Sequence, residues 1–129
     1  MNKKIICAVI FFIFVLPNVF SAPVPNYRGI YYKKMKNFTM YLRFFEDGRV
    51  ISVNVPGKYI DINRWFNTTY RENYGKYSIN GNIISFTTRA EEGSVEYSGV
   101  IGKKNLTLTI RSLINDHVEK NVNFKFASF

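Results

Sequence analysis

From residue 29 onward, apolar and polar side chains alternate with a period of two, which is typical of strands that bury one face. The alternation is interrupted by one long connection and otherwise continues to the end of the chain. It predicts eight strands, with the expected ranges Gly29–Lys33, Thr39–Phe45, Arg49–Val55, Gly75–Ile79, Asn82–Thr88, Ser94–Ile101, Leu106–Ser112 and Asn121–Ala127.

The first predicted hairpin turns at Asp47-Gly48, a favoured two-residue connection. This turn predicts that Phe44 pairs with Ile51 and that Leu42 pairs with Val53. These four apolar side chains then share one face of the hairpin. The opposite face is mixed, and it carries Tyr41, Arg43, Phe45, Val50, Ser52 and Asn54.

Two further hairpins separate apolar from polar positions in the same way. Asn80-Gly81 is a second favoured turn, and it places Tyr77 opposite Ile84. A third hairpin turns around Gly102–Asn105 and pairs Glu96 with Arg111 on its polar face. Its apolar face, continued by the last strand, consists of Val95, Tyr97, Gly99, Ile101, Leu106, Leu108, Ile110, Val122, Phe124 and Phe126.

The agreement among these hairpins predicts the fold class. Antiparallel strands with one apolar face need a place to bury that face. A closed, up-and-down antiparallel β-barrel of about eight strands buries it and removes the sheet edges. Such a barrel has an interior that side chains fill or that holds one small ligand. A sandwich of two sheets is the alternative architecture.

The connection from Pro56 to Asn73 has a different pattern. Its larger apolar side chains recur at helical spacing, and Asp61 is placed to cap a helix start, but several poor helix formers lie among them. We expect one or two helical turns or an ordered loop. The segment then serves either as a lid over the barrel mouth or as a plug with Trp65 packed in the core.

The first 21 residues have the layout of a secretory signal peptide. Two lysines precede an apolar run from Ile5 to Leu16, and small residues follow near Ser21 and Ala22. The run is too short to span a bilayer as a helix, because twelve residues reach about 18 Å. We therefore expect residues 1–21 to be removed and residues 22–129 to form one barrel domain. A retained signal anchor is the alternative.

This leader predicts a secreted protein, or a periplasmic one in a bacterium, with no stable membrane insertion after cleavage. In a eukaryotic secretory pathway, three Asn-x-Thr sequons are glycosylation candidates. They begin at Asn37, Asn67 and Asn105.

The formal net charge of +9 favours acidic partners. The positive residues are scattered, however, and a solvated barrel surface explains such a distribution equally well. Nucleic-acid binding would rest on Tyr41 and Phe45 beside Arg43, but the leader argues against it and we expect none. The remaining candidates for a partner are an acidic molecule and another protein.

Catalytic chemistry has little support in the sequence. The single cysteine, Cys7, lies in the leader, and His117 is the only histidine, so we expect no disulfide, metal site or cofactor. The acidic pairs Glu46-Asp47 and Glu91-Glu92 each precede a glycine at a predicted turn, where acids usually face solvent. We expect the protein not to be an enzyme.

Three segments resemble the lipocalin-like (calycin) proteins. Gly29-Ile30-Tyr31 resembles the Gly-x-Trp start of a lipocalin, with Tyr in place of Trp. The runs 41–50 and 74–82 are similar to hairpins of small secreted members. The resemblance implies a barrel that carries a small apolar molecule. The chain departs from the family in lacking the first-strand Trp, the disulfide and a recognisable helix after the barrel.

Two functions follow from these observations. The first is a secreted lipocalin-like barrel that binds a small hydrophobic ligand in its lumen, where only Tyr77 and Tyr97 offer polar groups. The second is a filled barrel that acts as an interaction module and binds an acidic or protein partner through its basic outer face. The predicted lining of the lumen is Leu42, Phe44, Ile51, Val53, Trp65, Tyr77, Phe86, Tyr97, Leu108, Ile110 and Phe124.

Overall fold

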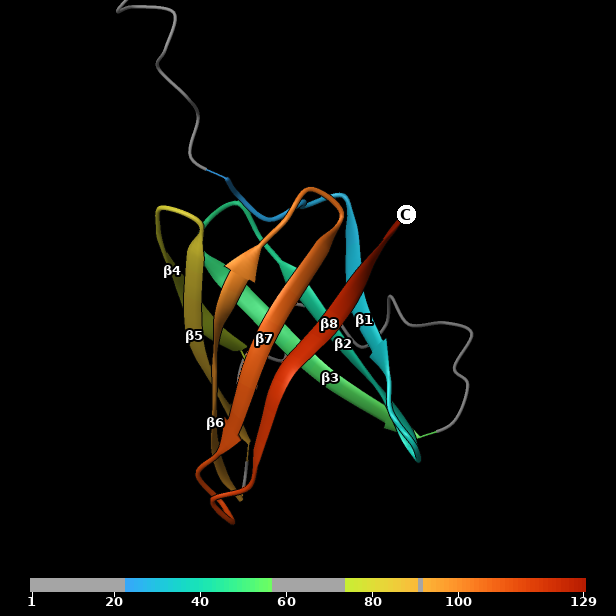
Figure 1. The fold of residues 1–129 in the computed structure, drawn as a ribbon, viewed down its shortest axis with the longest axis vertical. Coiled ribbons are helices and arrows are strands. Elements are labelled where there is room, and N and C mark those ends of the chain that lie inside the picture. Colours follow the sequence, from blue (N-terminus) through green and yellow to red (C-terminus); the bar gives the residue numbers. More distant parts are fainter. Residues whose placement is uncertain (1–22, 57–73, 91) are drawn as a thin grey trace, which may run out of the picture.

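A computed structural model describes residues 23–56, 74–90 and 92–129. In these ranges the chain forms a closed antiparallel barrel in which each strand pairs with the next and the last pairs with the first (Figure 1). The predicted barrel is therefore confirmed, and the two-sheet sandwich is wrong. The strands are β1 (Gly29–Lys34), β2 (Phe38–Phe44), β3 (Arg49–Pro56), β4 (Tyr74–Asn80), β5 (Ile83–Ala90), β6 (Gly93–Ile101), β7 (Asn105–Ser112) and β8 (Val118–Ser128).

Closure depends on the pairing of β1 with β8, from Gly29 opposite Ser128 to Tyr32 opposite Lys125. Because each barrel strand has a neighbour on both sides, the sheet buries its apolar face against itself. The predicted leader, nearly all of the Pro56–Asn73 connection with Trp65, and Glu91 of the second acidic pair lie outside the described residues. Within those residues, no helix is long and apolar enough to span a membrane.

The β2–β3 hairpin differs from the prediction by one residue. Phe44 pairs with Val50 and Leu42 pairs with Ser52. The amide of Phe45 donates to the carbonyl of Arg49 at 2.8 Å, so three residues form the loop and Gly48 takes a φ of +96°. A three-residue loop that ends in a residue of positive φ is a common hairpin connection, and the sequence Asp-Gly fits it as well as it fits the shorter turn.

This shift of one residue exchanges the two faces of β3. Val50 is fully buried in the main core, and Ser52 faces the barrel interior. Ile51 and Val53, predicted to line the lumen, belong instead to a second cluster that also contains Tyr41.

The other hairpins keep their predicted faces. In β4–β5, Tyr77 pairs with Phe86, a shift of two residues that leaves inward and outward positions unchanged. The shift arises because the turn is built on Gly81, which has a φ of +66°, and Asn82. In β6–β7, Glu96 lies opposite Arg111, as predicted.

The main core lies inside the single closed sheet of the barrel. Phe44 lies among three aromatic rings, with centroid distances of 5.5 Å to Tyr31, 5.3 Å to Tyr77 and 5.5 Å to Phe86. Phe86 in turn stacks on Tyr97 at 4.5 Å. Aromatic groups of this size account for a large part of the apolar surface that the fold buries.

Candidate binding surfaces

Most of the predicted lining residues do meet in the barrel interior. Tyr77 packs against this cluster while remaining partly exposed, and Ile51 and Val53 lie in the second cluster. Trp65 lies outside the described residues. The predicted residues that are buried together in the main cluster are Leu42, Phe44, Phe86, Tyr97, Leu108, Ile110 and Phe124.

Both predicted polar groups of the lumen already have protein partners. The hydroxyl of Tyr97 lies 3.1 Å from that of Ser52. The hydroxyl of Tyr77 donates to the carbonyl oxygen of Phe45 at 2.8 Å and lies 3.1 Å from the hydroxyl of Tyr27. Burial, with a contribution from Tyr27, raises the pKa of Tyr77 well above its ordinary value. Both hydroxyls therefore form hydrogen bonds within the protein itself.

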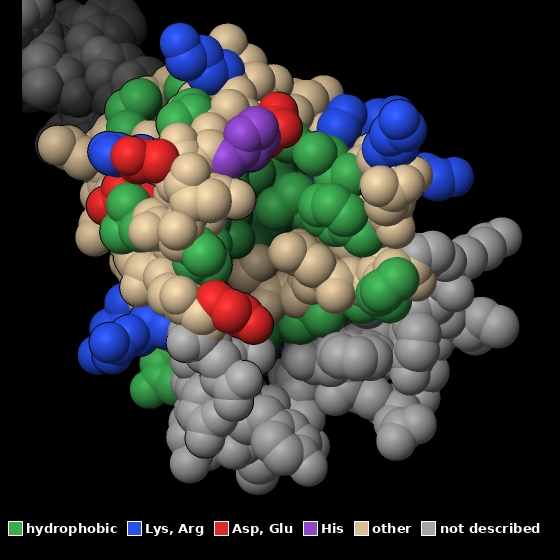
Figure 2. All heavy atoms as spheres, turned by 90° about the horizontal axis from the view of Figure 1, so that it is seen from below, with side chains coloured by type: hydrophobic (Ala, Val, Ile, Leu, Met, Phe, Trp, Pro, Cys, Tyr) green, Lys and Arg blue, Asp and Glu red, His purple; other side chains and the backbone are tan. Residues whose placement is uncertain are grey.

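One end of the barrel is hollowed. Seen from below, hydrophobic side chains gather inside a depression at the end that carries the β7–β8 turn (Figure 2). Ile110 and Val122, both about 7% exposed, belong to the same core. A small apolar group could contact the core only from such an opening, because the aromatic cluster around Phe44 occupies the interior.

A different chemistry is found on the outer face of β1, β2 and β3. Because Leu42 and Phe44 point into the core, their neighbours Tyr41, Arg43 and Phe45 point outward. The guanidinium of Arg43 lies 4.9 Å from the ring centroid of Phe45.

Two more aromatic rings and a second arginine extend this arrangement. The guanidinium of Arg43 also lies 4.6 Å from the ring of Phe129, and that of Arg49 lies 5.1 Å from Phe45 and 5.9 Å from Tyr74. All four distances are within the range of cation–π attraction. We call Phe129, Arg43, Phe45, Arg49 and Tyr74 the arginine–aromatic stack.

The two arginines of the stack differ in their partners. Arg49 forms an ion pair with Asp47 at 2.7 Å, and the hydrogen bond from its backbone amide holds the pKa of Asp47 below its usual value. Arg43 has no ion pair with any described residue, and its buried Nε has no hydrogen-bond partner among them. Burial lowers the pKa of Arg43. An unpartnered buried donor is costly. Because Nε itself is buried, an anion would bind at the two terminal nitrogens of the Arg43 guanidinium.

The charges around the stack are predominantly positive. β1, β2 and β3 contain no acidic residue and four basic ones, of which Lys34, Arg43 and Arg49 occupy outward positions of their strands. Apart from Glu46 and Asp47, the described acidic residues lie elsewhere in the barrel, in two places. One is β6 with the turn before it, and the other is the β7–β8 turn with the start of β8. These residues are Glu92, Glu96, Asp116 and Glu119.

A pocket of about 400 Å³ lies beside the stack, over the β1–β2 hairpin. Tyr32 and Tyr41, which pair across the two strands, form part of its wall. Lys34 and Lys36 supply positive charge. The full lining is Tyr32, Lys34, Met35, Lys36, Asn37, Phe38, Thr39 and Tyr41.

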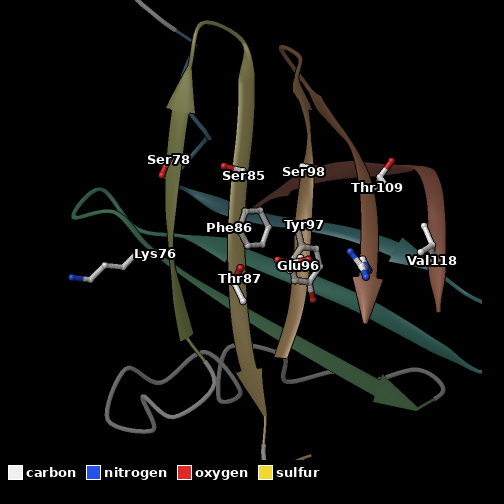
Figure 3. A pocket seen from close by; sticks show the side chains of 11 residues that line it. Lys76, Ser78, Ser85, Phe86, Thr87, Glu96, Tyr97, Ser98, Thr109 and Val118 are labelled. Carbon is white, nitrogen blue, oxygen red and sulfur yellow. The ribbon is translucent and has the colours of Figure 1, made fainter. Parts of the chain in front are cut away.

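A larger depression, of about 600 Å³, lies over β4, β5, β6 and β7 (Figure 3). Ser78, Ser85, Ser98 and Thr109 follow one another in register and form a row of hydroxyl groups across the four strands. Lys76 and Glu96 occupy the neighbouring row. This surface is polar and has no exposed aromatic side chain at its centre.

The described catalytic candidates, His117, Glu46, Asp47 and Glu92, are exposed and lie in connections between strands. His117 Nε2 lies 2.8 Å from a carboxylate oxygen of Glu119, and both side chains are about half exposed or more. Among residues 23–56, 74–90 and 92–129, no three acidic, cysteine or histidine side chains are grouped so as to hold a metal ion.

Sequence reasoning placed Tyr41, Arg43 and Phe45 on the outer face but did not find the complete stack. Tyr74 and Phe129 are distant from Arg43 along the chain, so only the closed sheet brings them together. The alternation within β2 was the one local signal, because it marked Arg43 as an outward residue between two outward aromatics.

No family model, curated protein or solved structure matches this chain. The protein is a closed antiparallel barrel of eight strands, and this architecture is compatible with the lipocalin-like fold that the sequence resembles.

Proposed function

We propose that this protein is a secreted binding module that holds an acidic partner on the outer face of β1, β2 and β3. The observation that carries the proposal is the placement of Arg43 between the rings of Phe45 and Phe129 without an acidic partner among the described residues. A guanidinium stacked on aromatic rings is pre-oriented and can donate to a carboxylate, sulfate or phosphate with its planar edge.

The distribution of charge and the packing of aromatic rings in the interior support the same proposal. An acid-free group of strands attracts anions over a distance, which raises the rate of encounter. The aromatic rings around Phe44 already pack against one another. A ligand would therefore gain more binding energy from the outer face of the barrel than from its interior. The signal-like leader is consistent with an extracellular partner.

The test is the affinity of the secreted protein for a sulfated polyanion at several salt concentrations. Arg43→Gln combined with Arg49→Gln should weaken binding at least about tenfold and reduce its salt dependence by about two released ions. Arg89→Gln combined with Lys120→Gln removes the same charge from exposed positions on β5 and β8 and serves as the control. Equal losses in both double variants would show that net charge alone governs binding.

A small apolar ligand bound at the hollow end of the barrel is the second candidate function. The hydrophobic depression in Figure 2 favours it. Native mass spectrometry of the secreted protein should then reveal a co-purified small molecule, and Ile110→Glu should prevent its retention. A bare mass in every preparation, with no displacement of a fluorescent fatty acid, would contradict this function.

A further inference from the structure

The pocket over the β1–β2 hairpin and the arginine–aromatic stack are parts of one surface. Tyr41 lines the pocket and lies two residues before Arg43 on β2, so both side chains point outward. Alternate residues of a strand are about 7 Å apart, and Phe45 follows Arg43 at the same interval. Tyr41, Arg43 and Phe45 are each partly exposed, so an extended ligand that lies along β2 can contact the pocket and the stack together.

The pocket combines partly exposed aromatic rings with positively charged lysines, and few classes of ligand bind both. Tyr32 and Tyr41 are partly exposed aromatic side chains, while Lys34 at the end of β1 is exposed and positively charged. The faces of aromatic rings carry partial negative charge and attract the polarised C–H groups of a sugar ring. Ammonium groups bind the anionic substituents of such a ring.

The size of the pocket agrees with this chemistry. Its volume of about 400 Å³ lies in the range of sites that hold a small molecule or one or two sugar units. Outside the pocket, Arg43 offers a further positive group at the far end of β2, beside Arg49, which is paired with Asp47. Positive groups at both ends of an aromatic surface fit a polymer that repeats its negative charges.

On the basis of the function proposed above, we propose that the acidic partner is an anionic polysaccharide lying along β2. One sugar unit occupies the pocket and lies against the wall formed by Tyr32 and Tyr41, and its anionic group meets Lys34. A later anionic group along the polymer meets Arg43.

An acidic peptide fits this surface less well. Peptides commonly bind to a sheet by adding a strand to a free edge. β1 is hydrogen-bonded to β8 and β2, and β2 is hydrogen-bonded to β1 and β3, so neither strand offers a free edge. Along β1 and β2 a peptide would have to use its side chains alone. Beyond Ile51, β3 has no β4 partner among the described residues, but no residue of β3 lines the pocket.

The experiment compares three probes by calorimetry on the full secreted chain. The probes are a sulfated heparin-type octasaccharide, the same octasaccharide without sulfate, and a decaglutamate peptide. Because Asn37 lines the pocket and begins a sequon, all proteins carry Asn37→Gln so that no glycan covers the site. The expected result is binding of the sulfated probe at least about tenfold tighter than either of the other two.

Variants then separate the pocket from the stack. Tyr32→Leu should weaken binding of the sulfated octasaccharide about fivefold or more while leaving decaglutamate unaffected, because only a sugar ring uses the aromatic wall. Lys34→Gln should weaken the same probe, whereas Arg89→Gln should not. Circular dichroism and the unfolding midpoint of each variant establish that the barrel is intact.

Two negative results have different meanings. If decaglutamate binds as tightly as the octasaccharide, and Arg43→Gln weakens it while Tyr32→Leu has no effect, the polysaccharide is excluded but an acidic partner is supported. If neither anionic probe binds, or if Arg43→Gln changes nothing, the proposed function itself is wrong.

Discussion

Phe44 on β2 lies directly opposite Val50 on β3, and this pairing decides which side chains of β3 reach the outer face. With Val50 inside, Ile51 points outward and packs in the cluster that also contains Tyr41 and Phe45. The outer surface beside Arg43 is therefore more apolar than the mixed face expected from a two-residue turn. Desolvation of Arg43 follows from these neighbours.

The loop conformation that sets this pairing should depend on Gly48. Its φ of +96° disfavours any residue with a Cβ, although the space around it is open. We expect Gly48→Ala to lower the free energy of unfolding by about 1–2 kcal/mol. Urea denaturation followed by circular dichroism measures the change, and Ser98→Ala on the exposed face of β6 is the control. A midpoint equal to that of the unaltered protein would contradict the loop conformation described here.

The stability of the barrel should depend more on Phe44, in the interior, than on its outward neighbour Phe45. Phe44 is 1% exposed and contacts three other rings, whereas Phe45 is only partly buried. Phe44→Ala is expected to cost about 3–5 kcal/mol, because it removes a large buried side chain and leaves a cavity. Phe45→Ala should cost clearly less. Denaturant titration of both variants checks the order, and a reversed order would place Phe44 outside the core.

Stability should fall at alkaline pH through Tyr77. Burial raises the pKa of this hydroxyl in the folded protein, while the unfolded chain titrates near its ordinary value of 10.0. The contribution of the protonated Tyr77 hydroxyl to the free energy of unfolding is thus complete below about pH 10. It is lost as the pH rises further, because the unfolded chain then releases this proton while the folded protein keeps it. Tyr77→Phe should therefore flatten the decline in unfolding free energy between about pH 9 and about pH 11. Tyr32→Phe, at a residue in the partly exposed outer pocket, provides the comparison. If the free energy of unfolding declines with pH equally in the unaltered protein and both variants, the raised pKa of Tyr77 is contradicted.

Substitution of Arg43 should weaken binding of the anionic partner without lowering the stability of the fold. Its Nε is buried without a partner among the described residues, and this cost offsets the attraction between the guanidinium and the rings of Phe45 and Phe129. Arg43→Met keeps an elongated side chain between the two rings and removes the charge. We expect an unfolding free energy that is unchanged or higher by up to about 1 kcal/mol, together with at least about tenfold weaker binding of a sulfated polyanion. Denaturation and calorimetry on the same preparation test both parts, and a protein that is destabilised but binds normally would refute the assignment.

The sequence by itself determined the fold class and most inward positions. Period-two alternation places Leu42, Phe44, Leu108 and Phe124 on one side of their strands whatever the strands pair with, so their burial followed from local pattern. The β6–β7 register was also predicted correctly. There, the register that pairs Glu96 with Arg111 also brings apolar side chains together on the opposite face.

Only the tertiary structure decided the faces of β3 and the composition of the outer surface. The Asp47-Gly48 sequence is compatible with two loop lengths that differ by one residue, and local preference does not choose between them. Packing of Val50 beside Phe44 accompanies the longer loop. The stack around Arg43 needs Tyr74 and Phe129, which reach it only because β3 pairs with β4 and β8 closes onto β1. Such contacts arise from the closed sheet, and the period of a single strand carries no information about them.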